Sequence, residues 1–98
     1  MDIKIQAIHF DATEKLETFI NKKVEKLQKS HEDIQKVEVQ LKVEKPATAN
    51  NKNASITVTI PGGTPYAEKT CDTFEEAVDL CLDAIKVQLA KVKEKQRK

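Results

Sequence analysis

Residues 36–44, KVEVQLKVE, decide the fold, because apolar and polar side chains alternate through the whole stretch. Valine or leucine stands at every second position, with charged or amide residues between. This period of two predicts a half-buried strand of an antiparallel sheet. ASITVTI (54–60) has the same period, and the turn residues PGGTP (61–65) separate it from a weaker strand, YAEKTC (66–71). The composition of KPATANNKN (45–53) is that of a turn, without any period.

A further strand and two helices flank this meander. IKIQAI (3–8) alternates like a short strand, whereas residues 13–29 and about 73–95 have apolar residues at helical spacing. The first apolar stripe comprises Leu16, Phe19, Ile20, Val24 and Leu27. The second comprises Phe74, Ala77, Val78, Cys81, Leu82, Ile85, Leu89 and Val92. The candidate N-caps are Asp11 or Thr13 for the first helix and Asp72 or Thr73 for the second.

The order β-α-β-β-β-α predicts an α+β fold. Each amphipathic helix must bury its apolar stripe against another element. A four-stranded sheet with one polar face offers its other, apolar face for this packing. We therefore expect a single domain over residues 1–98, with two helices packed on one face of the sheet.

The composition excludes several classes of protein. The 98 residues are 39% hydrophobic and 34% charged, with no apolar run long enough for a membrane span and no secretory signal at the start. Two cysteines without a CxxC motif suit a reducing cytoplasm. We expect Cys81 to be buried and Cys71, at the end of a strand, to be exposed.

The net charge of +1 conceals an asymmetry along the chain. Residues 86–98 hold six cations and one anion, while the rest hold 11 cations and 15 anions. Part of this cluster has a simple interpretation, a solvated helix end whose cations stabilise the helix dipole. The alternative is a surface that binds a polyanion, since six cations exceed what the dipole requires.

The placement of the lysines favours the second interpretation. On a helical projection, the cations of the first helix lie on one flank of its stripe and the glutamates on the other. The C-terminal turns of the last helix are basic on both flanks. If the two helices lie side by side, their lysines could merge into one stripe suited to RNA phosphates. Of four aromatic residues, Phe19 and Phe74 belong to core stripes, so we expect recognition of RNA shape and backbone.

Residues capable of other chemistry do not form a recognisable site. His9 and His31 have no partner at metal spacing, and no HExxH motif occurs. The turn around PGG (61–63) lacks the other residues of a phosphate-binding loop, and Asp79 and Asp83 fit solvated helix positions. We therefore predict no enzyme, no metal, no cofactor and no small-molecule substrate.

Three stretches resemble the ribosome hibernation-promoting factor family, also called the protein Y or sigma-54 modulation protein family. They are ATEKLETFINKKVEKLQK (12–29), VQLKVEK (39–45) and DTFEEAVDLCLDAIKVQLAKVKEK (72–95). The likeness covers essentially the whole chain and is to the short members of the family. It implies a cytoplasmic, ribosome-associated translation inhibitor. Such a protein binds the small subunit in the channel for mRNA and tRNA, where its helices present basic residues to 16S rRNA in idle 70S ribosomes.

Position by position, the resemblance assigns RNA binding to Lys23, Lys26, Lys91, Lys93 and Lys95. The charge pattern adds Lys22, Lys29, Lys86 and Arg97. The chain departs from the family at Ala84 and Val87, where a basic residue is common. We expect the free protein to be monomeric. A generic double-stranded RNA-binding domain is the alternative, although such domains usually place basic residues at the start of the last helix, where this chain has DTFEEA (72–77).

Overall fold

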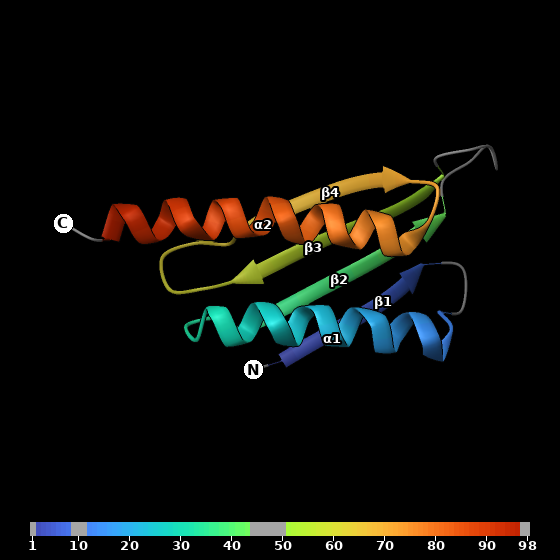
Figure 1. The fold of residues 1–98 in the computed structure, drawn as a ribbon, viewed down its shortest axis with the longest axis horizontal. Coiled ribbons are helices and arrows are strands. Elements are labelled where there is room, and N and C mark those ends of the chain that lie inside the picture. The colour runs from blue at the N-terminus through green and yellow to red at the C-terminus, as the bar shows by residue number, and fades with distance from the viewer. Residues whose placement is uncertain (1, 9–11, 44–50, 97–98) are drawn as a thin grey trace.

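The computed structural model describes residues 2–8, 12–43 and 51–96, with side chains as far as residue 92. Four strands form one sheet in the order β1-β2-β3-β4. In chain order the elements are β1 (Asp2–Ile8), α1 (Glu14–Ser30), β2 (Lys36–Val43), β3 (Lys52–Thr59), β4 (Tyr66–Cys71) and α2 (Phe74–Gln96). The predicted α+β fold and element order are confirmed (Figure 1).

The sheet is mixed, which corrects the antiparallel sheet that we expected around residues 36–44. β2 pairs antiparallel with β3, but it pairs parallel with β1, so that Ile3 lies opposite Val37 and Ala7 opposite Leu41. The physical reason is the connection: α1 crosses over between β1 and β2, and such a crossover brings the chain back in the same direction.

β3 begins earlier than the sequence indicated. Lys52 and Asn53 fell in the expected turn, yet both are paired in β3. Asn53 is buried, and its side-chain amide donates to Glu68 Oε2 at 3.1 Å and to Thr70 Oγ1 at 3.0 Å. Pairing with β4 thus supplies the partners that a buried amide requires. Residues 45–50 of the expected turn lie outside the described residues.

A tight turn joins β3 to β4. Ile60 and Gly63 exchange main-chain hydrogen bonds of 3.1 and 3.2 Å around Pro61 and Gly62. Gly62 has a φ of 90°, which a residue with a side chain rarely adopts. Proline followed by a glycine of positive φ is the arrangement of a type II turn, so the PGG sequence fixes this reversal.

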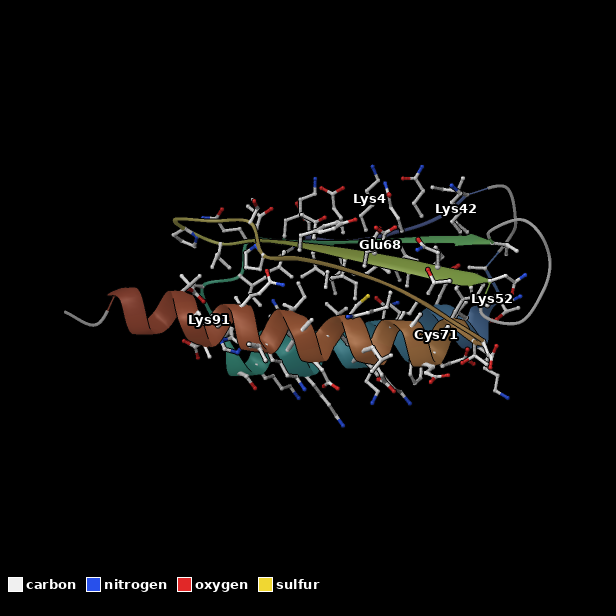
Figure 2. The ribbon with its side chains drawn as sticks, turned by 90° about the horizontal axis from the view of Figure 1, so that it is seen from above. Lys4, Lys42, Lys52, Glu68, Cys71 and Lys91 are labelled. Carbon is white, nitrogen blue, oxygen red and sulfur yellow. The ribbon has the colours of Figure 1, made fainter. Side chains whose placement is uncertain are left out.

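Both helices cover the same face of the sheet and leave its other face open (Figure 2). The core between the layers contains the fully buried residues Ile20, Leu27, Leu41, Ile56 and Ile85, among others. Both predicted helical stripes lie in this core or pack against its edge, as Phe19 and Val92 do. Lys4 and Lys42 stand on the open face, away from both helices (Figure 2).

Threonine side chains start both helices. Thr13 Oγ1 accepts from the Leu16 main-chain N–H at 3.1 Å, and Thr73 Oγ1 accepts from that of Glu76 at 3.1 Å. Each bond satisfies one of the amide groups left unpaired in a first helical turn. Thr13 and Thr73 are therefore the caps among the predicted candidates, while Asp11 lies outside the described residues. At the other end of α1, the His31 main-chain N–H donates to Leu27 O at 3.1 Å.

Both cysteines are buried, and the expected exposure of Cys71 is wrong. Its side chain is 7% exposed, because it ends β4 on the face that the helices cover. Burial, followed by the carboxylates of Glu76 and Asp72, raises the pKa of the Cys71 thiol. The Cys81 thiol donates to Ala54 O at 3.3 Å, and burial raises its pKa to about 11. Both groups are neutral thiols at neutral pH.

Neither described helix has a stretch apolar enough to cross a lipid bilayer.

Candidate nucleic-acid interface

The two helices run in the same direction. β4 is parallel to β2 through two antiparallel steps, and each helix runs antiparallel to the strand that precedes it. α1 and α2 therefore have their N-termini at one end and their C-termini at the other (Figure 1). The C-terminal turns of both helices thus lie at the same end of the helix layer. Cations in those turns add to one local field.

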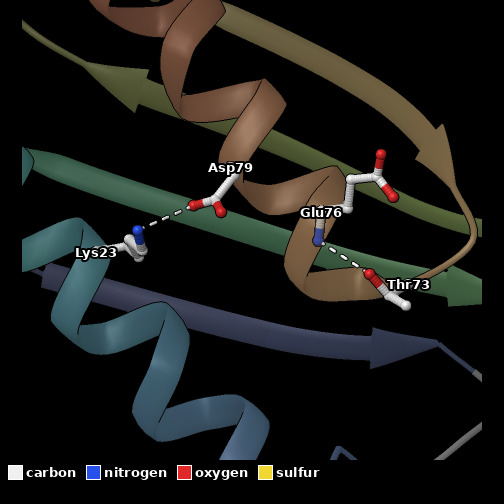
Figure 3. A network of polar contacts seen from close by, with 4 residues as sticks. All are labelled: Lys23, Thr73, Glu76 and Asp79. Atoms are coloured by element: carbon white, nitrogen blue, oxygen red, sulfur yellow. Dashed lines mark hydrogen bonds and ion pairs between the residues drawn. The ribbon is translucent and has the colours of Figure 1, made fainter.

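One ion pair joins α1 to α2. Lys23 Nζ of α1 lies 3.2 Å from Asp79 Oδ1 of α2 (Figure 3). The same ammonium group lies 5.5 Å from the centre of the Phe19 ring. Lys23 thus lies at the edge of the core, and its charge is already partnered by a carboxylate. The sequence pattern held no signal for this pairing, because it depends on how the two helices pack.

α2 reaches far beyond α1. From the Lys23–Asp79 pair, α1 continues for seven residues to Ser30 and α2 for 17 residues to Gln96. At 1.5 Å per residue, the extra ten residues extend α2 by about 15 Å past the end of α1. Among the α2 residues whose side chains the structure describes, Leu89 is the last that is buried, and Val92 is partly buried. The segment that follows projects as a helix from the body of the protein (Figure 1).

Charge is segregated along the helix layer. The first half of α2 carries Glu75, Glu76, Asp79 and Asp83 and no cation, whereas residues 86–96 carry four lysines and one glutamate. α1 shows the same trend, with Glu14 and Glu17 in its first turn and Lys29 in its last. Because the helices are parallel, the acidic ends lie together and so do the basic ends. An anionic partner is therefore attracted to one end of the layer.

The Lys23–Asp79 contact also shows which flank of each helix faces the other. Lys22, Lys26 and Lys29 are exposed on the flank of α1 that turns toward α2. Lys86, seven residues after Asp79, lies on the flank of α2 that turns toward α1, because seven residues make nearly two turns. Lys91 lies on the opposite flank. The basic surface therefore has two parts, a shared groove side and the outer flank of α2.

The other predicted site residues are only partly described. Lys93 and Lys95 lie within α2, but their side chains are outside the described part of the chain, as is all of Arg97. At the positions that depart from the resemblance, Val87 is 56% exposed and Ala84 is half-buried. The exposed side chain of Val87 thus lies between Lys86 and Lys91 around the helix axis. RNA contacts of all nine basic residues stay a prediction.

Among the described residues, no group of three or more His, Cys, Asp or Glu side chains is placed to hold a metal ion.

Comparison with known proteins gives this geometry a context. A model of the family described as Sigma 54 modulation protein / S30EA ribosomal protein matches residues 3–97. The "Ribosome hibernation promoting factor" of Pseudomonas putida is 30% identical over 97 residues, which cover 99% of this chain and 91% of the relative.

Solved structures show the same fold. A ribosomal subunit interface protein from Coxiella burnetii superimposes with a TM-score of 0.85 at 24% identity, covering 96% of this chain and 99% of the other. The N-terminal domain of Protein Y from Thermus thermophilus gives a TM-score of 0.78 at 22% identity, with 94% and 99% covered.

Proposed function

Because the chain belongs to the Sigma 54 modulation protein / S30EA ribosomal protein family, we propose that it is a ribosome hibernation factor that inhibits translation. It binds the small ribosomal subunit through phosphates of 16S rRNA and occludes the channel for mRNA and tRNA in idle 70S ribosomes. Residues 1–98 act as one ribosome-binding domain in the cytoplasm, and residues 86–98 are its basic C-terminal segment.

The observation that carries this proposal is the projecting, cationic end of α2. It combines a regular helical backbone with a reach of about 15 Å beyond α1. A rigid helix holds its lysines at fixed angles, so less conformational entropy is lost on binding than with a disordered basic tail. Lysine ammonium groups bind phosphate as point charges and carry little base specificity. That combination suits a folded rRNA surface.

We assign the phosphate contacts to two groups of residues. The groove group comprises Lys22, Lys26, Lys29 and Lys86, and the end group comprises the cations from residue 91 onward, which are Lys91, Lys93, Lys95 and Arg97. Lys23 was assigned to rRNA by the resemblance, but it is half-buried and paired with Asp79. Its phosphate contact therefore requires that the ion pair opens.

A general double-stranded RNA-binding domain remains the alternative to test. Its usual basic cluster at the N-terminus of the last helix is replaced here by Glu75 and Glu76. These carboxylates repel phosphate from the helix end whose dipole would otherwise attract it. We therefore expect small subunits to compete for the protein far better than free duplex RNA does.

Binding to purified 30S subunits, measured by co-sedimentation over a series of salt concentrations, tests the proposal. With about six phosphate contacts, log K should fall against log salt with a slope of roughly −4 to −5. Replacing Lys91, Lys93 and Lys95 together by glutamate should abolish binding and leave the circular dichroism spectrum unchanged.

The matched control is Lys4→Glu with Lys42→Glu, since both lysines stand on the open face of the sheet (Figure 2). This variant should bind subunits like the wild type. Wild-type affinity in the triple α2 variant, or equal loss in the control, would overturn the assignment of the helix layer as the RNA surface.

A further inference from the structure

The side chain of Gln88 in α2 makes two hydrogen bonds with the main chain of β4. Its Nε2 donates to Tyr66 O at 2.6 Å, and its Oε1 accepts from the Tyr66 N–H at 3.0 Å. An amide side chain has a donor and an acceptor side by side, as a peptide group does. Gln88 thus pairs with Tyr66 in the way that a residue of a neighbouring strand would.

The contact between Gln88 and Tyr66 lies at the start of an edge strand. β4 is an edge strand, and Tyr66 is its first residue. Because α2 runs antiparallel to β4, the start of β4 lies where α2 leaves the sheet (Figure 1). Gln88 is adjacent to Leu89, the last buried residue in the part of α2 whose side chains are described. The two hydrogen bonds therefore hold the helix at its point of exit.

Hydrophobic contacts alone leave the rotation of a helix on a sheet weakly defined, since they are non-directional. Hydrogen bonds require defined distances and angles. Gln88 lies about 60° from Lys91 around the helix axis, because the two are three residues apart. Fixing the rotation of α2 at Gln88 thus also fixes the direction in which Lys91 points.

We propose that Gln88 is a positioning residue that clamps α2 to the edge of β4 and so sets the direction of the cationic helix end. The consequence for RNA binding rests on the proposed function. The Gln88 side chain carries no charge, so if charge alone determined the affinity for RNA, Gln88 would have no effect on it. If the direction of the helix end also matters, loss of the clamp weakens RNA binding although the net charge is unchanged.

A comparison of neighbouring substitutions separates the two accounts. Gln88→Lys and Val87→Lys each add one cation, at adjacent positions of α2. If charge alone matters, both should bind 30S subunits more tightly. With the clamp, Val87→Lys gains affinity, whereas Gln88→Lys and the neutral Gln88→Met bind about three- to tenfold more weakly, the range expected for one lost net hydrogen bond. Val87→Met is the neutral control and should bind like the wild type.

Measurements on the free protein test the clamp itself. The Tyr66 amide should exchange with deuterium faster in Gln88→Met than in the wild type, with unchanged exchange in the centre of β3. Residual dipolar couplings of amides 89–96 should show that this segment is less well aligned with residues 74–85. In Gln88→Glu, protection of Tyr66 relative to the wild type should return as pH falls and the introduced carboxyl gains a proton, since only the acid form both donates and accepts.

The outcomes are distinct. Equal Tyr66 exchange in Gln88→Met and the wild type would refute the clamp. A Gln88→Lys protein that binds subunits as tightly as Val87→Lys would refute its role in positioning, even if the clamp exists. If the wild type does not bind subunits, the proposed function fails, and the dipolar couplings still decide whether Gln88 sets the direction of the helix end.

Discussion

Releasing Lys23 from its ion pair should strengthen RNA binding. Asp79→Asn removes the carboxylate that lies 3.2 Å from the Lys23 ammonium. The two side chains are 38% and 48% exposed, so the pair stabilises the fold by only about 0.2–1 kcal/mol. The contact with the Phe19 ring keeps part of the Lys23 side chain in place. We expect a cooperative unfolding transition that is weakened by roughly 0.5 kcal/mol.

The effect on binding has two parts that different measurements separate. Removing one negative charge near the phosphates raises the affinity by about 1 kcal/mol at most, which is about fivefold. A newly available ammonium group adds one phosphate contact, which steepens the plot of log K against log salt by about 0.9. Co-sedimentation with 30S subunits between about 50 and 200 mM salt measures both.

Asp83→Asn is the matched control, since it removes an exposed carboxylate four residues further along α2. It should raise the affinity modestly and leave the slope unchanged. In a Lys23→Met background, Asp79→Asn should behave like Asp83→Asn. Equal salt slopes for the two single variants in the wild-type background would refute the idea that Asp79 withholds Lys23 from RNA.

Three other predictions follow from single residues. Thr13→Ala and Thr73→Ala should each lower the free energy of unfolding by about 1 kcal/mol, because each removes an N-cap; denaturant titration measures the loss, and unchanged midpoints would contradict the capping role. The folded state resists ionisation of Cys81, whose pKa is raised from 9.0 to about 11. The stabilisation from the neutral Cys81 thiol is complete below pH 9, and about 2 kcal/mol of it is lost as pH rises toward 11. In Cys81→Ala the free energy of unfolding should therefore fall less steeply over this range than in the wild type. An equal fall in both proteins would contradict the prediction. Val87→Lys should raise the affinity for 30S subunits severalfold at little cost in stability, because the site is 56% exposed. Unchanged binding would contradict this and would show that position 87 lies away from the phosphates.

The local signals in the sequence predicted most of the fold. Period-two alternation located the strands to within two residues, and helical spacing identified the buried stripes of both helices. Thr13 and Thr73 were among the predicted caps, because capping depends on bonds within one turn. The parallel pairing of β1 with β2 could also have been predicted from the order of elements, since adjacent strands joined by a crossover helix pair in parallel.

What the sequence did not show depends on contacts between distant segments. Asn53 reads as a turn residue until Glu68 and Thr70 supply its hydrogen bonds. Cys71 ends its strand, but the helix layer buries it. Lys23 looked like a free cation because its partner Asp79 lies 56 residues away. The Asn53 contacts arise from the pairing of β3 with β4 and the Lys23–Asp79 contact from the packing of α1 beside α2, and no periodicity encodes either.

A map of the protein bound to the small ribosomal subunit, obtained by electron cryomicroscopy, tests the central claim most directly. Our account predicts that the helix layer faces 16S rRNA, that the projecting end of α2 lies against phosphates in the mRNA and tRNA channel, and that Lys4 and Lys42 on the open face of the sheet point away from the contacted RNA. Density that places the open face against rRNA, or α2 away from it, would contradict the account.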